Sequence, residues 1–159
     1  MMQKQRFLII TIAVVILVSL TACGPSTSDV DWKETSFQNQ QKEAISDVMA
    51  MQEAAWNEAD IDQFMEGYWK SEKLRFSGSN LTYGWDNTKN NYKKSYPDNE
   101  AMGKLTFEII EIELTSAESA LLFGRYTLIR NLDKPTGLFT LAWRKIDGKW
   151  LITSDMTCG

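Results

Sequence analysis

The sequence predicts an α+β domain in which a strongly bent antiparallel sheet wraps around N-terminal helices and forms a cone with a pocket. Two alternating runs flank Asp147-Gly148, the strongest short signal for a β-hairpin. Helical spacing of apolar residues is confined to residues 40–96, and long alternating segments fill residues 104–159. Because a sheet that is aromatic on one face needs a cover, the helices are expected to supply it.

The final hairpin spans Gly137 to Gly159. A two-residue turn fixes the register of its strands, and both turn residues must tolerate positive φ. The expected cross-strand pairs are Trp143 with Ile152, Leu141 with Ser154, and Phe139 with Met156. These residues and Trp150 form one apolar face, and the opposite polar face holds Thr140, Ala142, Arg144, Thr153 and Asp155.

Residues 1–22 have the features of a secretory signal peptide. Lys4 and Arg6 precede an uncharged run, Phe7 to Leu20, which is too short for an ordinary transmembrane helix. The following Leu20-Thr21-Ala22-Cys23 resembles a bacterial lipoprotein box, which implies cleavage before Cys23 and acylation of its thiol. The alternative is a simple membrane anchor with an incidental cysteine. The lipoprotein interpretation places the protein in the bacterial cell envelope, lipid-anchored on the periplasmic side or the cell surface.

Composition excludes several classes of function. The formal net charge is −4, and it would be −6 without Lys4 and Arg6, so we expect no nucleic-acid partner. The chain has no histidine, and therefore lacks the commonest general base and the commonest metal ligand. We expect no metal site and no cofactor. If Cys23 is acylated, Cys158 has no partner for an intrachain disulfide.

The polar residues 23–39 are expected to form a flexible tether, and the cone domain is expected to span 40–159. A first helix is predicted over about 40–59. Asp60 can cap a second helix, with Gln63 three residues on. The stripe that follows predicts buried positions at Ile61, Phe64 and Met65, with Tyr68 as a pocket residue because its hydroxyl needs a partner.

The remaining elements follow in order. Short strands are expected at 74–77 and 80–83 around Gly78, and a polar helix over 86–96 ends before Pro97. In the long strand 104–114 the apolar parity switches, which predicts a β-bulge near Ile109-Ile110. The strand 120–130 is expected to add Gly124, Tyr126 and Leu128 to the apolar face, and Arg125 and Thr127 to the polar one.

This order of elements resembles the nuclear transport factor two-like superfamily, specifically its SnoaL-like lipoproteins of unknown function. The residues that carry the resemblance are Ala55-Trp56-Asn57, Asp60-Ile61, Phe64, Tyr68-Trp69, Tyr83-Gly84-Trp85, Tyr96-Pro97, Met102-Gly103-Lys104-Leu105, Gly124-Arg125-Tyr126, Phe139-Thr140-Leu141, Trp143-Arg144-Lys145, Trp150, Ile152 and Asp155. The resemblance implies the cone fold and a homodimer through the outer face of the sheet. It implies no single activity, because the superfamily hosts isomerases, dehydratases, cyclases and binding domains.

Amphipathic aromatic side chains on several elements are candidates for the pocket lining, where they would hold a small, partly apolar ligand. The candidate pocket residues are Trp56, Tyr68, Tyr83, Trp85, Tyr92, Tyr126, Ser154 and Met156. The alternative is that these aromatics simply form the core.

Asp155 is a weak candidate for a catalytic base. The expected register places it on the polar face, where a solvated or hydrogen-bonded carboxylate at the strand end is the favoured interpretation. Relatives often carry a histidine after this aspartate, whereas this chain has Met156, which cannot transfer a proton. The sequence therefore favours a binding role over catalysis.

Three functions stay open. The first is a membrane-anchored domain that binds a small molecule or acts as an accessory protein. The second is a SnoaL-type lyase, isomerase or cyclase that uses acid–base chemistry in the pocket. The third is a homodimeric protein-interaction module.

Overall fold

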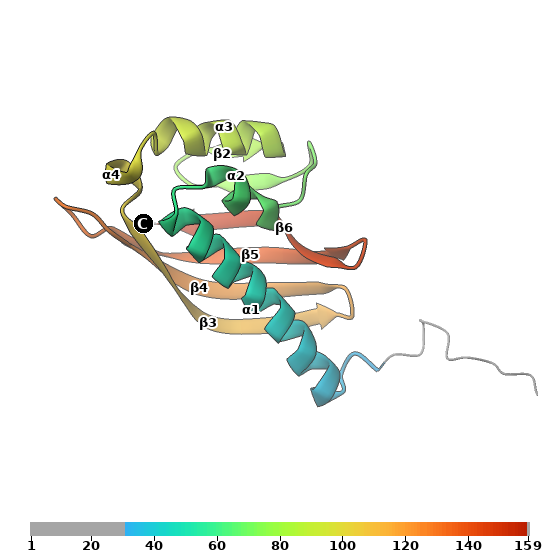
Figure 1. Cartoon of the computed structure of the whole chain (residues 1–159). Helices are drawn as coiled ribbons and strands as arrows, with labels where there is room; N and C mark the ends of the chain where they lie inside the picture. The colour runs from blue at the N-terminus through green and yellow to red at the C-terminus, as the bar shows by residue number, and fades with distance from the viewer. Residues whose placement is uncertain (1–30, 159) are drawn as a thin grey trace, which may run out of the picture. The chain divides into compact units, whose positions relative to one another are not determined.

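The computed structural model describes residues 31–158, which form a helical layer packed on one curled sheet. The strand order is β2-β1-β6-β5-β4-β3 (Figure 1). The strands are β1 (Arg75–Ser77), β2 (Leu81–Tyr83), β3 (Lys104–Ser116), β4 (Ser119–Ile129), β5 (Thr136–Ile146) and β6 (Lys149–Cys158). All neighbours are antiparallel except β1 and β6, which are parallel. The predicted α+β cone is therefore confirmed, with one parallel pairing added.

The helices are α1 (Thr35–Asn57), α2 (Ile61–Phe64), the 3₁₀ turn η2 (Met65–Gly67), α3 (Trp85–Ser95) and α4 (Asn99–Met102). Helix α1 crosses one face of the sheet diagonally, and α3 lies at the β1–β2 end (Figure 1). Asp60 caps α2 as predicted, accepting a hydrogen bond from the Gln63 backbone N–H at 2.8 Å. No helix within residues 31–158 is long and apolar enough to cross a membrane.

Helix α1 begins at Thr35, earlier than the expected start at residue 40. The expected boundary between tether and domain therefore falls inside this helix. Trp32 and Phe37 pack against the core. Gln41 is also buried. Its side-chain oxygen is satisfied there, since it accepts hydrogen bonds from Trp150 Nε1 at 3.1 Å and Lys145 Nζ at 2.9 Å. Because this buried position is polar, the sequence of the first turns of α1 lacks the regular apolar spacing that predicts a helix. Cys23 and the rest of the expected leader lie outside the described residues.

The C-terminal end of α1 is fastened to the edge strand β3. Asn57 accepts a hydrogen bond from the Leu105 backbone N–H at 2.8 Å and donates to the Leu105 carbonyl at 3.0 Å. One turn earlier, Glu53 accepts from the Phe107 backbone N–H at 2.7 Å. These contacts satisfy backbone groups that an edge strand otherwise leaves unpaired. They also hold the helix over the inner face of the sheet.

Strand β3 carries the predicted β-bulge. Ile109 pairs with Gly124, and Glu111 pairs with Phe123, so Ile110 is the extra residue. Ile110 is exposed on the outer side, and Ile112 and Leu114 return to the core. A bulge increases local bending, which agrees with the curl of the sheet.

The β5–β6 hairpin turns at Asp147 and Gly148, whose φ angles of 50° and 78° are both positive, as predicted. The expected pairing of Trp143 with Ile152 is confirmed. Beyond that pair the predicted register is wrong. Ala142 pairs with Ser154, so Thr153 is an extra residue, and its hydroxyl donates to the Ala142 carbonyl at 3.1 Å.

The bulge at Thr153 exchanges the faces of the residues that follow it. Leu141 lies opposite Asp155 instead of Ser154, and Phe139 lies opposite Thr157 instead of Met156. Asp155 therefore turns toward the interior, where it is only 4% exposed, and Met156 turns outward, where it is 57% exposed. Both placements reverse the expectation from the sequence.

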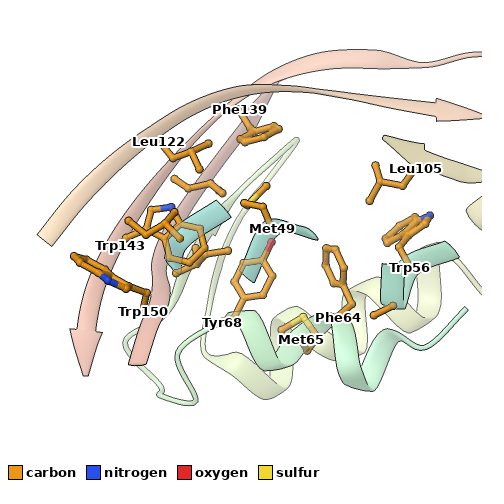
Figure 2. Close-up of a cluster of buried hydrophobic side chains, with 14 of the residues drawn as sticks. Met49, Trp56, Phe64, Met65, Tyr68, Leu105, Leu122, Phe139, Trp143 and Trp150 are labelled. Carbon is orange, nitrogen blue, oxygen red and sulfur yellow. The ribbon is translucent and has the colours of Figure 1, made fainter. Parts of the chain in front are cut away.

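The core lies between the inner face of the sheet and the helical segment. Figure 2 shows Phe64 and Tyr68 pointing from the helical side toward Leu122 and Phe139 on the strands. Trp143 is 1% exposed, and Trp150 and Ile152 are also buried, as the apolar-face prediction requires. At the other end Trp56 donates from Nε1 to the Met102 carbonyl at 3.2 Å.

Candidate functional site

A cavity of about 620 Å³ lies between the inner face of the sheet, α1, α3 and the β1–β2 hairpin. Its walls are mainly aromatic and aliphatic, and its rim is polar. The wall residues are Met49, Trp56, Phe64, Tyr68, Phe76, Tyr92, Tyr96, Leu105, Phe107, Tyr126, Leu128, Phe139 and Leu141. Polar lining comes from Gln52, Thr82, Thr88, Asn91, Lys94, Ser95, Asp155, Thr157 and the Gly78-Ser79-Asn80 loop. A cavity of this size accommodates a small organic molecule.

Asp155 is the buried carboxylate of this cavity. The Thr153 bulge turns it inward, and the parallel pairing with Phe76 places it beside β1. Its Oδ2 accepts a hydrogen bond from the Tyr68 hydroxyl at 2.7 Å, and its Oδ1 accepts from the Thr157 hydroxyl at 2.6 Å. Burial raises the pKa of Asp155 to about 6, and the two hydroxyl donors oppose that rise. The group therefore titrates close to neutral pH.

Two tyrosines extend the polar network into the cavity. The hydroxyls of Tyr68 and Tyr92 lie 3.5 Å apart. Burial raises the pKa of both phenols well above the ordinary value of 10, and the nearby Asp155 carboxylate adds to the effect. Both phenols are therefore neutral at physiological pH. They offer hydroxyl donors and acceptors, and the carboxyl of Asp155 is the group that changes charge.

An aromatic cluster surrounds this network. The Tyr92 ring centroid lies 5.3 Å from that of Phe64, 5.5 Å from that of Phe76 and 6.1 Å from that of Trp56, all edge to face. Tyr96 stacks on Tyr92 with centroids 6.1 Å apart. These arrangements fix the ring orientations. The cluster forms a wall that starts at the carboxylate and continues toward α4.

Helix α3 carries Tyr92 and is held in place by ion pairs to α2. Asp62 pairs with Lys89 and with Lys93, the latter at 2.9 Å. The Lys89 hydrogen bond, followed by that of Lys93, lowers the pKa of Asp62. Gly84 precedes the helix with φ of 90°, and its carbonyl accepts a hydrogen bond from the buried Thr88 hydroxyl at 2.9 Å. These contacts orient α3 so that Tyr92 faces the cavity.

Four of the predicted pocket residues line the cavity, namely Trp56, Tyr68, Tyr92 and Tyr126. The other four predicted placements are wrong. Tyr83 is exposed on β2. Trp85 donates from Nε1 to the Met65 carbonyl at 2.9 Å, and its ring lies beneath Lys70 and Lys89. Ser154 and Met156 lie on the outer side because of the Thr153 bulge.

Several lining residues were absent from the sequence-based pocket. Phe107 and Phe139 come from the alternating patterns of strands, which predict an apolar face but not a pocket, and their rings meet edge to face at 5.5 Å. Tyr96 is one turn after Tyr92, a spacing that signals a shared helix face. Phe76 depends on the pairing of β1 with β6, which is not local in sequence. Thr157 depends on the bulge, which no residue pattern in β6 marks.

The geometry changes how the absence of a histidine after Asp155 is interpreted. Position 156 faces outward, so a histidine there would not enter this cavity. Met156 therefore says nothing about chemistry in the pocket. Among residues 31–158, no group of three or more His, Cys, Asp or Glu side chains is placed to hold a metal ion.

Comparison with known proteins gives the family. No family model and no functionally curated protein shows significant sequence similarity to this chain. Among solved structures, a ketosteroid isomerase-like protein from Erwinia carotovora atroseptica SCRI1043 is 19% identical over 76% of this chain and 96% of its own, with a TM-score of 0.59. A domain of unknown function with a cystatin-like fold from Nostoc punctiforme is 14% identical over 79% of this chain and 78% of its own, with a TM-score of 0.62. Both show a shared fold only.

A third solved structure is much more similar in sequence. It is an NTF2-like protein of unknown function from Shewanella oneidensis MR-1, with a TM-score of 0.73. The two chains are 42% identical, over 75% of this chain and 99% of the other. The chain described here belongs to the nuclear transport factor 2 (NTF2)-like family.

Proposed function

We propose that this NTF2-like domain binds a small, partly apolar molecule in the cavity between its helices and the inner face of its sheet. The observation that carries the proposal is the buried carboxyl of Asp155, which opens into an aromatic-walled cavity of about 620 Å³. Apolar walls supply affinity, and a few convergent polar groups orient the ligand. The family includes proteins of several functions, so the support comes from the cavity itself.

Native mass spectrometry of the purified full chain tests this proposal. A retained small molecule, or one acquired from a library of small partly apolar compounds, is the expected result. The variant Leu141→Trp replaces an aliphatic side chain with a bulky indole in the cavity beside Asp155 and should abolish the bound species. The control Leu132→Trp adds the same ring at a fully exposed turn and should retain it. Binding that survives Leu141→Trp would contradict the cavity as the site.

Acid–base catalysis is the second candidate, because Asp155 is buried in the cavity with a pKa near 6. The carboxylate would take a proton from a carbon beside a substrate carbonyl. The electron pair of that C–H bond would form an enolate, whose oxygen accepts a hydrogen bond from a tyrosine hydroxyl. The proton would then return to the far carbon of an adjacent C=C bond as the double bond shifts toward the carbonyl. The test is hydrogen–deuterium exchange of enolisable ketones in D₂O, followed by NMR. Exchange should require Asp155 and survive the surface change Asp47→Asn; equal exchange with Asp155→Asn would rule this role out.

Assembly as a homodimer is part of the proposal. Leu138 and Met156 are about half exposed on the outer face of β5 and β6. Together they form a small exposed apolar site among the polar residues of this face, and exposed apolar patches mark interaction sites. A second copy could cover it through the symmetric contact common among homodimers. A protein-interaction module is the related alternative, in which this face binds a different protein.

We also propose attachment to a bacterial membrane through acylated Cys23, a residue outside the described part of the chain. The support is the sequence of residues 4–23 alone. Detergent phase partitioning of the protein made in a bacterial host tests it. The wild type should enter the detergent phase, and intact-mass analysis should show acyl groups on Cys23. A wild-type mass without acyl groups would contradict the anchor.

A further inference from the structure

We infer that the ligand of this cavity is an organic cation, an amine or quaternary ammonium with an apolar body. The inference rests on the proposed binding function and concerns the chemical class of the ligand. It follows from a buried carboxylate that no cationic side chain in the described residues pairs with, set among aromatic rings.

The buried carboxylate of the cavity has no cationic partner among the described residues. None of the ion pairs among residues 31–158 involves Asp155, whose partners are the neutral hydroxyls of Tyr68 and Thr157. Lys94 also lines the cavity, but it is exposed at the rim. Buried charges in proteins are ordinarily paired. A cationic ligand would supply the missing partner of the carboxylate.

Asp155 retains the capacity to bind such a ligand. An ionised carboxylate offers about four acceptor positions, and the two hydroxyls use one on each oxygen. The side chain lines the cavity, so the remaining positions are available from inside it. The N–H of a protonated amine can occupy one of them without displacing Tyr68 or Thr157, and a quaternary ammonium would pair with the same carboxylate through charge alone.

The aromatic wall suits the same ligand. The Tyr68 ring neighbours Phe64, with centroids 5.9 Å apart, and the Tyr92 ring contacts Phe64 and Phe76. Ring faces carry partial negative charge and attract cations, and such aromatic cages recognise quaternary ammonium groups. An anionic ligand would be repelled by the carboxylate and by the partial negative charge of the ring faces. A neutral ligand would pack on the walls but would gain neither the ionic attraction of the carboxylate nor the cation–π contribution.

Three probes with the same ring and different charge test the inference. Isothermal titration calorimetry of the full chain at pH 7.5 would compare 2-phenylethylamine, 2-phenylethanol and phenylacetate. We expect the amine to bind at least about tenfold more tightly than the alcohol, because a desolvated cation–π contact contributes at least that much. Phenylacetate should bind weakest. Asp155→Asn should remove the preference for the amine, and the matched surface change Asp47→Asn should preserve it.

The outcomes separate the two proposals. If the alcohol or phenylacetate binds as tightly as the amine, the cavity binds ligands but the cationic class is wrong. If none of the probes binds a folded protein at millimolar concentration, the cationic inference is overturned, and the mass spectrometry described above decides the binding function separately. If Asp155→Asn fails to fold, the ranking of the three probes on the wild type decides the question.

Discussion

At the residue scale, Asp155 is the side chain on which the account of the site depends. Its burial raises the pKa, and the hydroxyls of Tyr68 and Thr157 partly stabilise the ionised form. The groups that face it are uncharged at neutral pH, since burial also raises the pKa of Tyr68 and Tyr92. Protonation of the Asp155 carboxyl is therefore expected to change both the stability of the fold and the binding of charged ligands.

The pH dependence of stability follows from this raised pKa. Between about pH 4 and pH 6 the folded state binds more protons at Asp155 than the unfolded state, so the free energy of unfolding falls as the pH rises. Since one pKa unit is worth about 1.4 kcal/mol, the rise from 3.8 to about 6 corresponds to roughly 3 kcal/mol. Urea unfolding at several pH values should show this loss in the wild type relative to Asp155→Asn. Parallel curves for the two proteins would contradict it.

The hydroxyl of Tyr68 should tune the acidity of Asp155. Its hydrogen bond lowers the pKa of the carboxyl against the effect of burial. Tyr68→Phe removes that donor and should raise the pKa of Asp155 further, which NMR of the carboxyl carbon can detect. Tyr83→Phe makes the same chemical change on an exposed tyrosine outside the cavity and should leave this pKa unchanged. An unaltered pKa in Tyr68→Phe would show that the hydrogen bond is absent in solution.

At the element scale, two β-bulges show what the sequence could and could not predict. In β3 the apolar parity switches with three residues on each side, so the bulge at Ile110 was predictable. In β6 only Met156 follows Ile152 as an apolar marker, and its parity agrees with a regular strand. The bulge at Thr153 therefore left no local sign. The turn and the Trp143–Ile152 pair were predictable because they are set by neighbours in the chain.

The candidate site was half predictable for the same reason. Trp56, Tyr68 and Tyr92 belong to helical segments or their ends, and the apolar patterns there indicated a shared interior. Phe76 and Asp155 enter the site through the parallel contact of β1 with β6, between residues far apart in the sequence. Local patterns carry no information on such a pairing. Asp155 was named as a candidate, but its face was assigned wrongly.

Gly124 illustrates how neighbouring strands shape the cavity. A Cβ there would lie 2.3 Å from Phe139 Cζ and 3.0 Å from the Glu108 carbonyl oxygen. Gly124→Ala should therefore cost about 1–3 kcal/mol, typical of overpacking. Phe139→Leu in the same chain should recover part of that cost by removing the ring. A double-mutant cycle by urea unfolding measures the coupling, and additive effects would contradict the contact.

Trp143 should be the most costly truncation in the β5–β6 hairpin. It is 1% exposed at the pair next to the Thr153 bulge. Trp143→Ala should lower the free energy of unfolding by about 3–5 kcal/mol, as for other large aromatic residues in cores. Leu132→Ala, at a residue that is 94% exposed, should change it by less than about 0.5 kcal/mol. An unchanged melting temperature for Trp143→Ala would contradict the packing described here.

At the scale of the whole molecule, the proposed homodimer would form through the outer face of the sheet. Size-exclusion chromatography with light scattering should show a dimer for the wild type. Leu138→Glu places a charge on the outer face near Met156 and should give a monomer, because an unpaired buried charge opposes association. Leu132→Glu carries the same charge outside the strands and should stay dimeric. A wild-type monomer would contradict the proposed homodimer while leaving the cavity unaffected.

The whole account depends on a buried, titratable carboxyl in the cavity of an NTF2-like cone. The most direct test is NMR titration of the Asp155 carboxyl carbon, assigned by comparison with Asp155→Asn. We predict a pKa of about 6, because the Thr153 bulge turns the side chain inward and burial disfavours its charge. A pKa near the ordinary value of 3.8 would place the carboxylate in solvent on the outer face. That result would contradict both the bulge and the site built on it.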